Sequence, residues 1–188
     1  MVEVVELALR WLLTVVGDDV YGEKLLVDTR RSGVDIEYVR RAPGESSGIY
    51  LSVLDENRDM AVAVSSMAIL NRLDAGYLRE NRELLARARL SVFDANLTLE
   101  ALDYGTSLIT GQKKYLDLVS VTKALKVKSL LGRFYCIKPN RLEAEALTGL
   151  SAASHPGLRR NAEYFHEAGV AKVFITLGTE GVYFSDGV

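Results

Sequence analysis

An apolar run passes directly into a helix start at Phe134-Tyr135-Cys136-Ile137-Lys138-Pro139-Asn140-Arg141-Leu142-Glu143-Ala144-Glu145. Its first part is short and nearly continuously apolar, which is typical of a strand buried on both faces in a parallel sheet. Asn140 is a favoured helix N-cap, and Glu143, three residues later, can return a hydrogen bond to that cap. The pattern therefore predicts a strand over 134–138 followed by a helix over 141–148.

The same alternation extends from residue 77 to residue 184. We expect strands at 90–94, 134–138, 172–177 and 182–184, and helices at 77–89, 97–110, 121–131, 141–148 and 158–168. Short apolar strands that alternate with amphipathic helices predict an α/β fold of three layers, with a mostly parallel sheet between helices. Ligands of such sheets bind beyond the carboxyl ends of the strands. Because Asp94, Lys138–Asn140 and Thr176–Gly178 follow strand ends, we expect them at one rim.

The first third of the chain has a different pattern. Two β-like runs, 48–54 and 60–64, are separated by the polar residues 55–59, and this predicts a hairpin. Residues 6–13 suggest a helix, which passes into the next segment without the usual turn residues.

Composition excludes several classes of protein. The 188 residues are 48% hydrophobic and 26% charged, as expected for one globular domain. The net charge is −2 and the 23 lysines and arginines are dispersed, so we expect no nucleic-acid partner. Residues 1–16 include Glu3, Glu6 and Arg10 and are shorter than the ~20 residues of a spanning helix. We therefore expect a soluble protein of the cytoplasm or another intracellular compartment, without a membrane partner. The single cysteine, Cys136, is expected to be a buried thiol.

Asn140 and Glu143 allow two interpretations. In the first, they only cap the helix. In the second, the same helix end lies at the ligand rim, where its unpaired amides and partial positive charge suit a phosphate. Glu143 would then hold Mg²⁺ through water, since Mg²⁺ keeps several waters and takes only one or two carboxylates. Both interpretations stay open, and the two residues are candidate magnesium and nucleotide contacts.

The segment Thr176-Leu177-Gly178-Thr179-Glu180-Gly181 also allows two interpretations. It is a glycine-containing turn between the last two strands, or its hydroxyls and glycine amides form a surface that binds anions. The Gly-x-x-x-x-Gly-Lys-Ser/Thr spacing of a P-loop is absent from it, and Gly-x-Gly-x-x-Gly occurs nowhere in the chain. P-loop and dinucleotide-binding folds are therefore excluded, while Thr176, Gly178 and Gly181 remain candidate nucleotide contacts.

Four further residues lie at element boundaries. Asp94 and Asn96 end a strand and precede a helix, so they are a terminator and a cap or else contacts of a substrate or nucleotide. Ser120 and Lys123 lie at a helix start, where a serine cap and a solvated lysine explain them as well as a nucleotide contact does.

Seven segments in this order resemble the PfkB, or ribokinase-like, family of carbohydrate kinases. They are residues 16–22, 32–35, 46–50, 93–97, 119–124, 138–145 and 175–181. Each is a weak signal alone, but seven in register over almost the whole chain are specific to the family. The strings Asp94-Ala95-Asn96-Leu97, Val119-Ser120-x-x-Lys123-Ala124 and 138–145 are most similar to the members that phosphorylate pseudouridine.

The resemblance implies a ribokinase-like, three-layer α-β-α fold over residues 1–188, with a small β-lid inserted at about 36–66. It implies transfer of the γ-phosphoryl group of ATP, with Mg²⁺, to the 5'-hydroxyl of pseudouridine or a similar ribose-containing small molecule. Asn140 and Glu143 match the family's Asn-x-x-Glu element for magnesium and phosphate. Thr176 and Gly178 match the loop that touches ATP.

Matching positions also imply the remaining contacts. The substrate candidates are Asp18, Ser47, Tyr50, Asp94 and Asn96, and the further nucleotide candidates are Gly181, Ser120 and Lys123. The β-lid closes over the sugar and excludes water, which would otherwise accept the phosphoryl group. In several family members it pairs with the lid of a second subunit, which implies a homodimer through the hairpin.

The sequence departs from the family pattern in three places. The opening strand with its sugar-binding Gly-Gly/Asn segment and the later Gly-Ala-Gly-Asp segment have no counterpart, and the lid turn 56–59 lacks the usual glycine. Asp186 follows no Gly-Ala-Gly, so no catalytic base is assigned and the base is expected beyond Val188. A positioned base contributes about 10²–10⁴ in rate. We therefore expect a truncated, inactive or impaired kinase. Alternatives are another PfkB kinase, such as a ribokinase or fructokinase, and a non-catalytic module for nucleotide binding or dimerisation.

Overall fold

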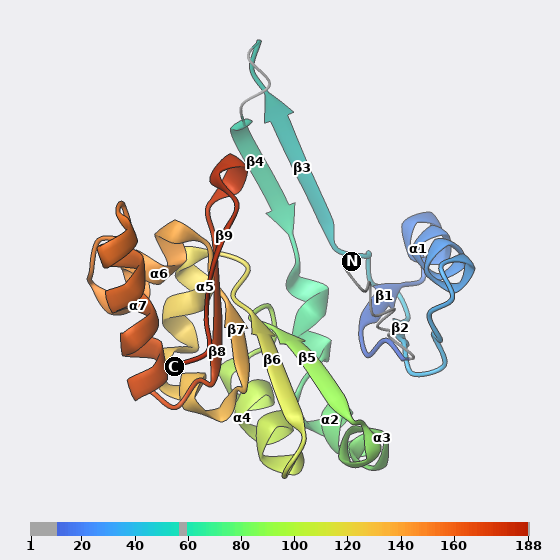
Figure 1. Ribbon diagram of the computed structural model, residues 1–188. Coiled ribbons are helices and arrows are strands. Elements are labelled where there is room, and N and C mark those ends of the chain that lie inside the picture. The colour runs from blue at the N-terminus through green and yellow to red at the C-terminus, as the bar shows by residue number, and fades with distance from the viewer. Residues whose placement is uncertain (1–10, 57–59, 188) are drawn as a thin grey trace. The chain divides into compact units, whose positions relative to one another are not determined.

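The structure is a computed structural model that describes residues 11–56 and 60–187. The chain divides into two compact units, residues 1–73 and 74–188 (Figure 1). The helix expected at 6–13 and the lid turn expected at 56–59 lie largely outside the described residues. No helix in the described part of the chain is long and apolar enough to cross a membrane.

The first unit contains two separate pairs of strands. Its elements are β1 (Val15–Gly17), α1 (Val20–Arg31), β2 (Arg40–Ala42), β3 (Ile49–Leu54), β4 (Met60–Ser66) and the 3-10 helix η1 (Ala68–Arg72). β1 and β2 pair in parallel, and α1 connects them. β3 and β4 form the antiparallel hairpin that the sequence predicts.

Asp19 organises the turn between β1 and α1. Its carboxylate caps α1 by accepting from the Gly22 amide at 2.7 Å, and it accepts from the amide and the hydroxyl of Ser47 at 2.8 Å each. The hydrogen bonds from Gly22 and Ser47 lower the pKa of Asp19. Gly17 allows the close approach, because a Cβ there would lie 2.3 Å from the Glu45 carbonyl oxygen. The entry to the hairpin is therefore fastened to the start of α1.

The second unit is a five-stranded sheet with the spatial order β5-β6-β7-β8-β9. The strands are β5 (Leu90–Asp94), β6 (Lys113–Asp117), β7 (Cys136–Lys138), β8 (Lys172–Thr176) and β9 (Val182–Ser185). The first four strands are parallel, and β9 is antiparallel to β8. The predicted mostly parallel sheet is therefore confirmed.

Helices connect these strands. They are α2 (Ala75–Glu80), α3 (Arg82–Arg87), α4 (Leu99–Leu108), α5 (Val121–Lys126), α6 (Arg141–Thr148), α7 (His155–Glu167) and the 3-10 helices η2 (Lys128–Arg133) and η3 (Gly178–Glu180). The single helix predicted over 77–89 is wrong, because α2 ends at Glu80 and its C-cap is Asn81, whose side chain donates to the Tyr77 carbonyl at 2.9 Å. The helix predicted over 121–131 likewise changes to η2 after α5.

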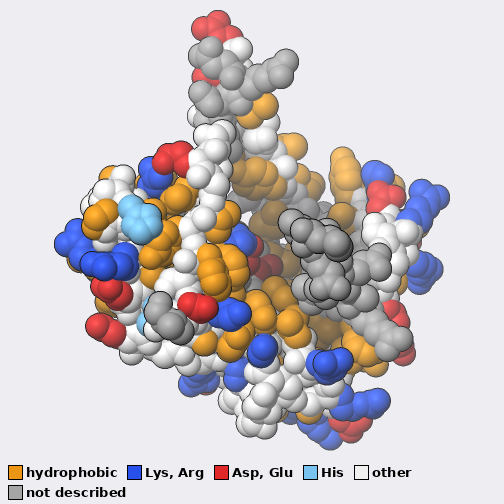
Figure 2. Space-filling model, in the orientation of Figure 1, with side chains coloured by type: hydrophobic (Ala, Val, Ile, Leu, Met, Phe, Trp, Pro, Cys, Tyr) orange, Lys and Arg blue, Asp and Glu red, His pale blue; other side chains and the backbone are white. Residues whose placement is uncertain are grey.

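The core lies between the sheet and the helices. One buried row crosses the four parallel strands in register, made of Phe93, Leu116, Ile137 and Val173. Figure 1 shows α5, α6 and α7 together on one side of the sheet. Side chains that alternate to the opposite face are exposed, among them Val92 (57%) and Phe184 (46%), and Figure 2 shows hydrophobic side chains gathered over β8 and β9. The described residues thus supply the sheet and one helical layer of the three-layer fold.

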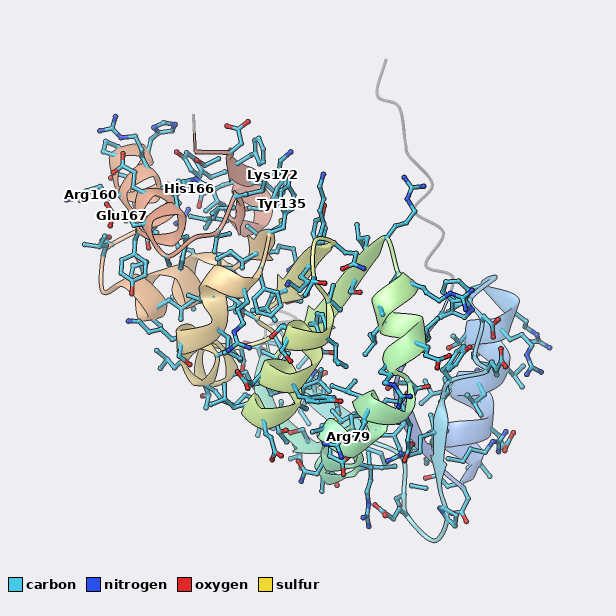
Figure 3. The ribbon with its side chains drawn as sticks, turned by 90° about the horizontal axis from the view of Figure 1, so that it is seen from below. Arg79, Tyr135, Arg160, His166, Glu167 and Lys172 are labelled. Atoms are coloured by element: carbon cyan, nitrogen blue, oxygen red, sulfur yellow. The ribbon has the colours of Figure 1, made fainter. Side chains whose placement is uncertain are left out.

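The sequence patterns did not predict β6. Two lysines at its start interrupt the apolar signal, yet both are accommodated. The Lys114 ammonium donates to the carbonyls of Ile109 (2.8 Å) and Thr106 (3.3 Å) near the end of α4, and burial lowers its pKa. Lys113 lies 4.6 Å from the centre of the Tyr135 ring. Lys172, the first residue of β8, lies 6.0 Å from the centre of the same ring (Figure 3).

Candidate functional site

Parallel strands bring the predicted rim residues to one edge of the sheet. Asp94, Asp117 and Lys138 are neighbours in register at the carboxyl ends of β5, β6 and β7. Asn140 forms an isolated parallel bridge with Thr176 at the end of β8, and the Thr176 amide donates to the Pro139 carbonyl at 2.9 Å. The shared rim expected from the strand pattern is therefore present in the second unit.

Asn140 and Glu143 form a complete capping box at the start of α6. The Asn140 Oδ1 accepts from the Glu143 amide at 2.9 Å, and the Glu143 Oε2 accepts from the Asn140 amide at 2.8 Å. Glu143 is only 3% exposed. The capping interpretation is confirmed, and both side chains are held rigidly at the rim.

The capping box limits how a cation could be bound here. Glu143 uses Oε2 for the cap, and Oε1 takes part in no hydrogen bond among the described residues. One free carboxylate oxygen on a nearly buried side chain suits an ion held through water better than direct bidentate coordination. Mg²⁺ is bound in this way, with one or two carboxylates, several waters and substrate phosphates. Glu143 therefore fits the magnesium role that the family resemblance implies.

The loop at residues 176–181 is closed by its own backbone. The Leu177 amide donates to the Gly181 carbonyl at 2.9 Å, and the Gly181 amide donates to the Gly178 carbonyl at 3.2 Å. Gly178 and Gly181 have φ values of +63° and +95°, a region that favours glycine. The sequence segment is therefore a tight glycine turn, and it lies next to the N-terminus of α6.

Asn96 and Lys123 come together at the other end of the rim. The Lys123 ammonium donates to the side-chain Oδ1 of Asn96, and the backbone amide of Asn96 donates to the Asp94 Oδ1 at 2.7 Å. Ser120 caps α5 by accepting from the Lys123 amide at 3.4 Å. The serine cap is confirmed, whereas Lys123 is not merely solvated but orients the Asn96 side chain.

A second lysine fastens the same segment. The Lys126 ammonium donates to the carbonyls of Ala95 (2.8 Å) and Leu97 (2.6 Å). Burial, followed by the charge of Lys123, lowers the pKa of Lys126. The 94–97 segment is thus held by two lysines that lie one turn apart on the same face of α5.

Two rim residues, Asp117 and Val119, were not singled out from the sequence. Val119 has φ +66°, the only positive value at a non-glycine residue in the described part of the chain, and it is the centre of a turn in which the Ser120 amide donates to the Leu118 carbonyl at 2.7 Å. The Asp117 Oδ1 accepts from the Val119 amide at 3.1 Å. Strained turns of this kind concentrate at ligand sites. Neither residue had a signal in the sequence, because the strand that Asp117 ends, β6, was itself not predicted.

The remaining predicted substrate residues belong to the first unit. Asp18 accepts from the Gly44 amide at 2.9 Å, and the buried Ser47 hydroxyl accepts from the Gly17 amide at 3.0 Å while it donates to Asp19. Tyr50 is 56% exposed on β3. The structure thus gives Asp18 and Ser47 partners within their own unit.

The fold agrees with comparisons to known proteins. Residues 9–188 match the pfkB family carbohydrate kinase. The chain belongs to the PfkB family. It is 38% identical over 176 residues to the pseudouridine kinase of Escherichia coli strain K12, across 94% of this chain and 56% of that protein. The chain spans about half the length of the curated relatives that it matches.

Solved structures superpose over nearly the whole chain. A crystal structure described as a sugar kinase from Clostridium perfringens has a TM-score of 0.80 and 30% identity, and the match covers 96% of this chain and 57% of that chain. A structure described as a ribokinase II from Escherichia coli, in complex with ATP and Mg²⁺, has a TM-score of 0.77 at 18% identity over 94% of this chain and 59% of that one. The second likeness shows the fold alone.

Proposed function

We propose that this chain is part of an ATP- and Mg²⁺-dependent kinase that phosphorylates the 5'-hydroxyl of pseudouridine or a similar ribose-containing molecule. Family membership supports the reaction class, and the 38% identity to a pseudouridine kinase supports the acceptor. The observation that carries the proposal is the capping box of Asn140 and Glu143, which sets a carboxylate and a helix N-terminus beside Thr176 at the ligand rim.

At the nucleotide end of the rim, the chain's own groups bind and orient phosphates. The positive N-terminus of α6 attracts them, and the amides around Gly178 and Gly181 add donors. Bound Mg²⁺ would neutralise charge that develops on the transferred phosphoryl group. Glu143 would hold this ion through water, while the capping box with Asn140 keeps the carboxylate in place.

At the acceptor end, Asp94 and Asn96 supply complementary groups for sugar hydroxyls. Because the Asn96 Oδ1 accepts from Lys123, the amide NH₂ of Asn96 is left to donate. The Asp94 Oδ1 accepts from the backbone amide of Asn96, and the Oδ2 of Asp94 can accept from a sugar hydroxyl. We assign the β3–β4 hairpin as the family's β-lid, inserted at about 36–66, and we keep Asp18, Ser47 and Tyr50 as proposed substrate contacts.

Binding of a nonhydrolysable ATP analogue, with and without Mg²⁺, tests the nucleotide assignment by titration calorimetry. We compare wild type with Glu143→Gln, which keeps an oxygen for the capping box but removes the charge. Wild type should bind the ATP analogue more tightly with Mg²⁺ than without it. In Glu143→Gln this increase in affinity should be about tenfold smaller, which corresponds to about 1.4 kcal/mol. The control is Glu145→Gln on the same helix, whose carboxylate accepts from the Ala152 amide instead. Absence of Mg²⁺-dependent binding in wild type would reject the proposal.

A panel of acceptors separates this proposal from a ribokinase-like or fructokinase-like function. Pseudouridine, uridine, ribose and fructose are titrated separately in the presence of the ATP analogue and Mg²⁺. The proposal expects pseudouridine to bind most tightly. Preference for a free sugar would favour the alternative.

A second candidate function is dimerisation through the β3–β4 hairpin. Large apolar side chains are exposed along both strands, namely Leu51 (63%), Val53 (58%), Val62 (52%) and Val64 (64%). A two-stranded hairpin with such side chains is marginal alone in water, and a partner would bury them. We expect Val53→Asp to abolish a dimer in sedimentation velocity, whereas Val20→Asp on α1, at a side chain 77% exposed, should leave it intact. A wild-type monomer at high concentration would reject this function.

A further inference from the structure

An ion pair joins the two predicted nucleotide motifs. Arg141 begins α6 directly after Asn140, and its guanidinium Nη2 donates to the Glu180 Oε2 at 3.0 Å. Glu180 ends the 3-10 turn η3, which forms the middle of the 176–181 loop. The two residues are 39 positions apart in sequence, so the pair reflects the fold rather than a local turn.

The backbone fixes only the beginning of that loop against α6. The Thr176 amide donates a hydrogen bond to the Pro139 carbonyl, and the later backbone hydrogen bonds join loop residues to one another. Among the described residues, Arg141 provides the hydrogen bond that connects η3 to the helix. The position of the glycine amides relative to the capping box therefore depends on this side-chain contact.

Electrostatics give the pair a second role. A phosphate site at the N-terminus of α6 needs positive potential, but Glu180 places a negative charge on the loop that borders it. Arg141 neutralises that charge by a direct hydrogen bond. Without Arg141, the Glu180 carboxylate would repel the nucleotide that the loop is proposed to bind.

The environment of Arg141 restricts its movement. Its side chain is 31% exposed, against 66% for Glu180. The Nε–H group is buried and has no hydrogen-bond partner among the described residues, which is an unfavourable arrangement for a donor. A partly enclosed guanidinium therefore meets a more exposed carboxylate, so the position of Arg141 is fixed more by its surroundings than that of Glu180.

We propose that Arg141 and Glu180 are positioning residues that hold the 176–181 loop against the N-terminus of α6, so that one nucleotide phosphate can contact both. This inference rests on the proposed nucleotide site. Because the pair is partly exposed, its effect should be modest, about two- to fivefold in nucleotide affinity.

Charge exchange tests the proposal. We compare wild type, Arg141→Glu, Glu180→Arg and the double exchange, and the matched control is Arg159→Glu, which breaks the Arg159–Glu163 pair on α7. Affinity for the ATP analogue with Mg²⁺ is measured by calorimetry, and amide hydrogen exchange is followed over residues 177–181. Each single exchange should weaken binding about two- to fivefold and speed loop exchange, and the double exchange should restore both. The control should change neither.

Three results would overturn the positioning role. If the double exchange does not restore the nucleotide affinity that Arg141→Glu loses, Arg141 contacts the nucleotide itself. Tighter binding by Glu180→Arg would mean that Glu180 only repels the ligand. Unchanged hydrogen exchange in both single variants would mean that the pair does not hold the loop. If wild type binds no nucleotide, the proposed function fails, while rescue of hydrogen exchange by the double exchange still supports the contact.

Discussion

Asp117 and Lys138 pair across the ends of β6 and β7, with 3.4 Å between the carboxylate Oδ2 and the ammonium Nζ. The other carboxylate oxygen accepts from the Val119 amide, so one aspartate ties a strained turn to the neighbouring strand. The ion pair is about half exposed, and such pairs contribute little energy by themselves. Its effect is to fix where the turn and the lysine lie at the rim.

Relief of the strain at Val119 should stabilise the protein. A branched residue with positive φ costs about 1–3 kcal/mol, and the greater freedom of glycine in the unfolded chain cancels about 0.5–1 kcal/mol of the gain. We expect Val119→Gly to raise the free energy of unfolding by about 0.5–1 kcal/mol in urea denaturation. Val119→Ala keeps a Cβ at positive φ and should gain less. A less stable Val119→Gly variant would show that the turn is unstrained.

Removal of the Ser47 hydroxyl should destabilise the first unit. The hydroxyl accepts from the Gly17 amide and donates to Asp19, so Ser47→Ala leaves a buried amide without an acceptor. Such a loss costs about 1–3 kcal/mol. Ser46→Ala, at the exposed neighbour, is the control and should be neutral. Urea denaturation followed by far-UV circular dichroism measures both, and equal stability of the two variants would contradict the network.

Stability at acidic pH should depend on Asp19. Hydrogen bonds from Gly22 and Ser47 lower its folded-state pKa below the ordinary aspartate value of about 3.9. The unfolded chain therefore binds the proton more tightly, and the stabilising contribution is complete above that value and is lost as the pH falls through the folded pKa. We expect wild type to lose stability over this acidic range more steeply than Asp19→Asn. Parallel pH profiles of the two proteins would contradict this linkage.

Elements with a local signal were predicted well from the sequence. The helix expected over 141–148 has the predicted bounds, because Asn140 and Glu143 encode its start through contacts three residues apart. The hairpin was also predicted, since its two apolar runs are neighbours in sequence. The rim followed from the parallel topology alone, because strand ends share one edge.

Elements that depend on distant partners were missed. β6 contains Lys114, whose charge is accommodated only by carbonyls near the end of α4. Lys123 was left open between a solvated side chain and a nucleotide contact, and its partner Asn96 lies 27 positions earlier. The positive φ of Val119 has no composition signal, since a branched residue is the last choice for such a turn. In each case the deciding contact exists only after the chain has folded.

Reactivity of the single cysteine provides a last test of the packing. Cys136 is 4% exposed in β7, and burial raises its pKa, while the positive charge of Lys172 opposes part of that rise. Since the thiolate is the reactive form, both burial and the raised pKa should slow modification by an aromatic disulfide reagent at neutral pH. We expect slow reaction of the native chain, fast reaction in urea, and slower native reaction still in Lys172→Met. Equal rates with and without urea would show that the end of the sheet next to Tyr135 is open to solvent.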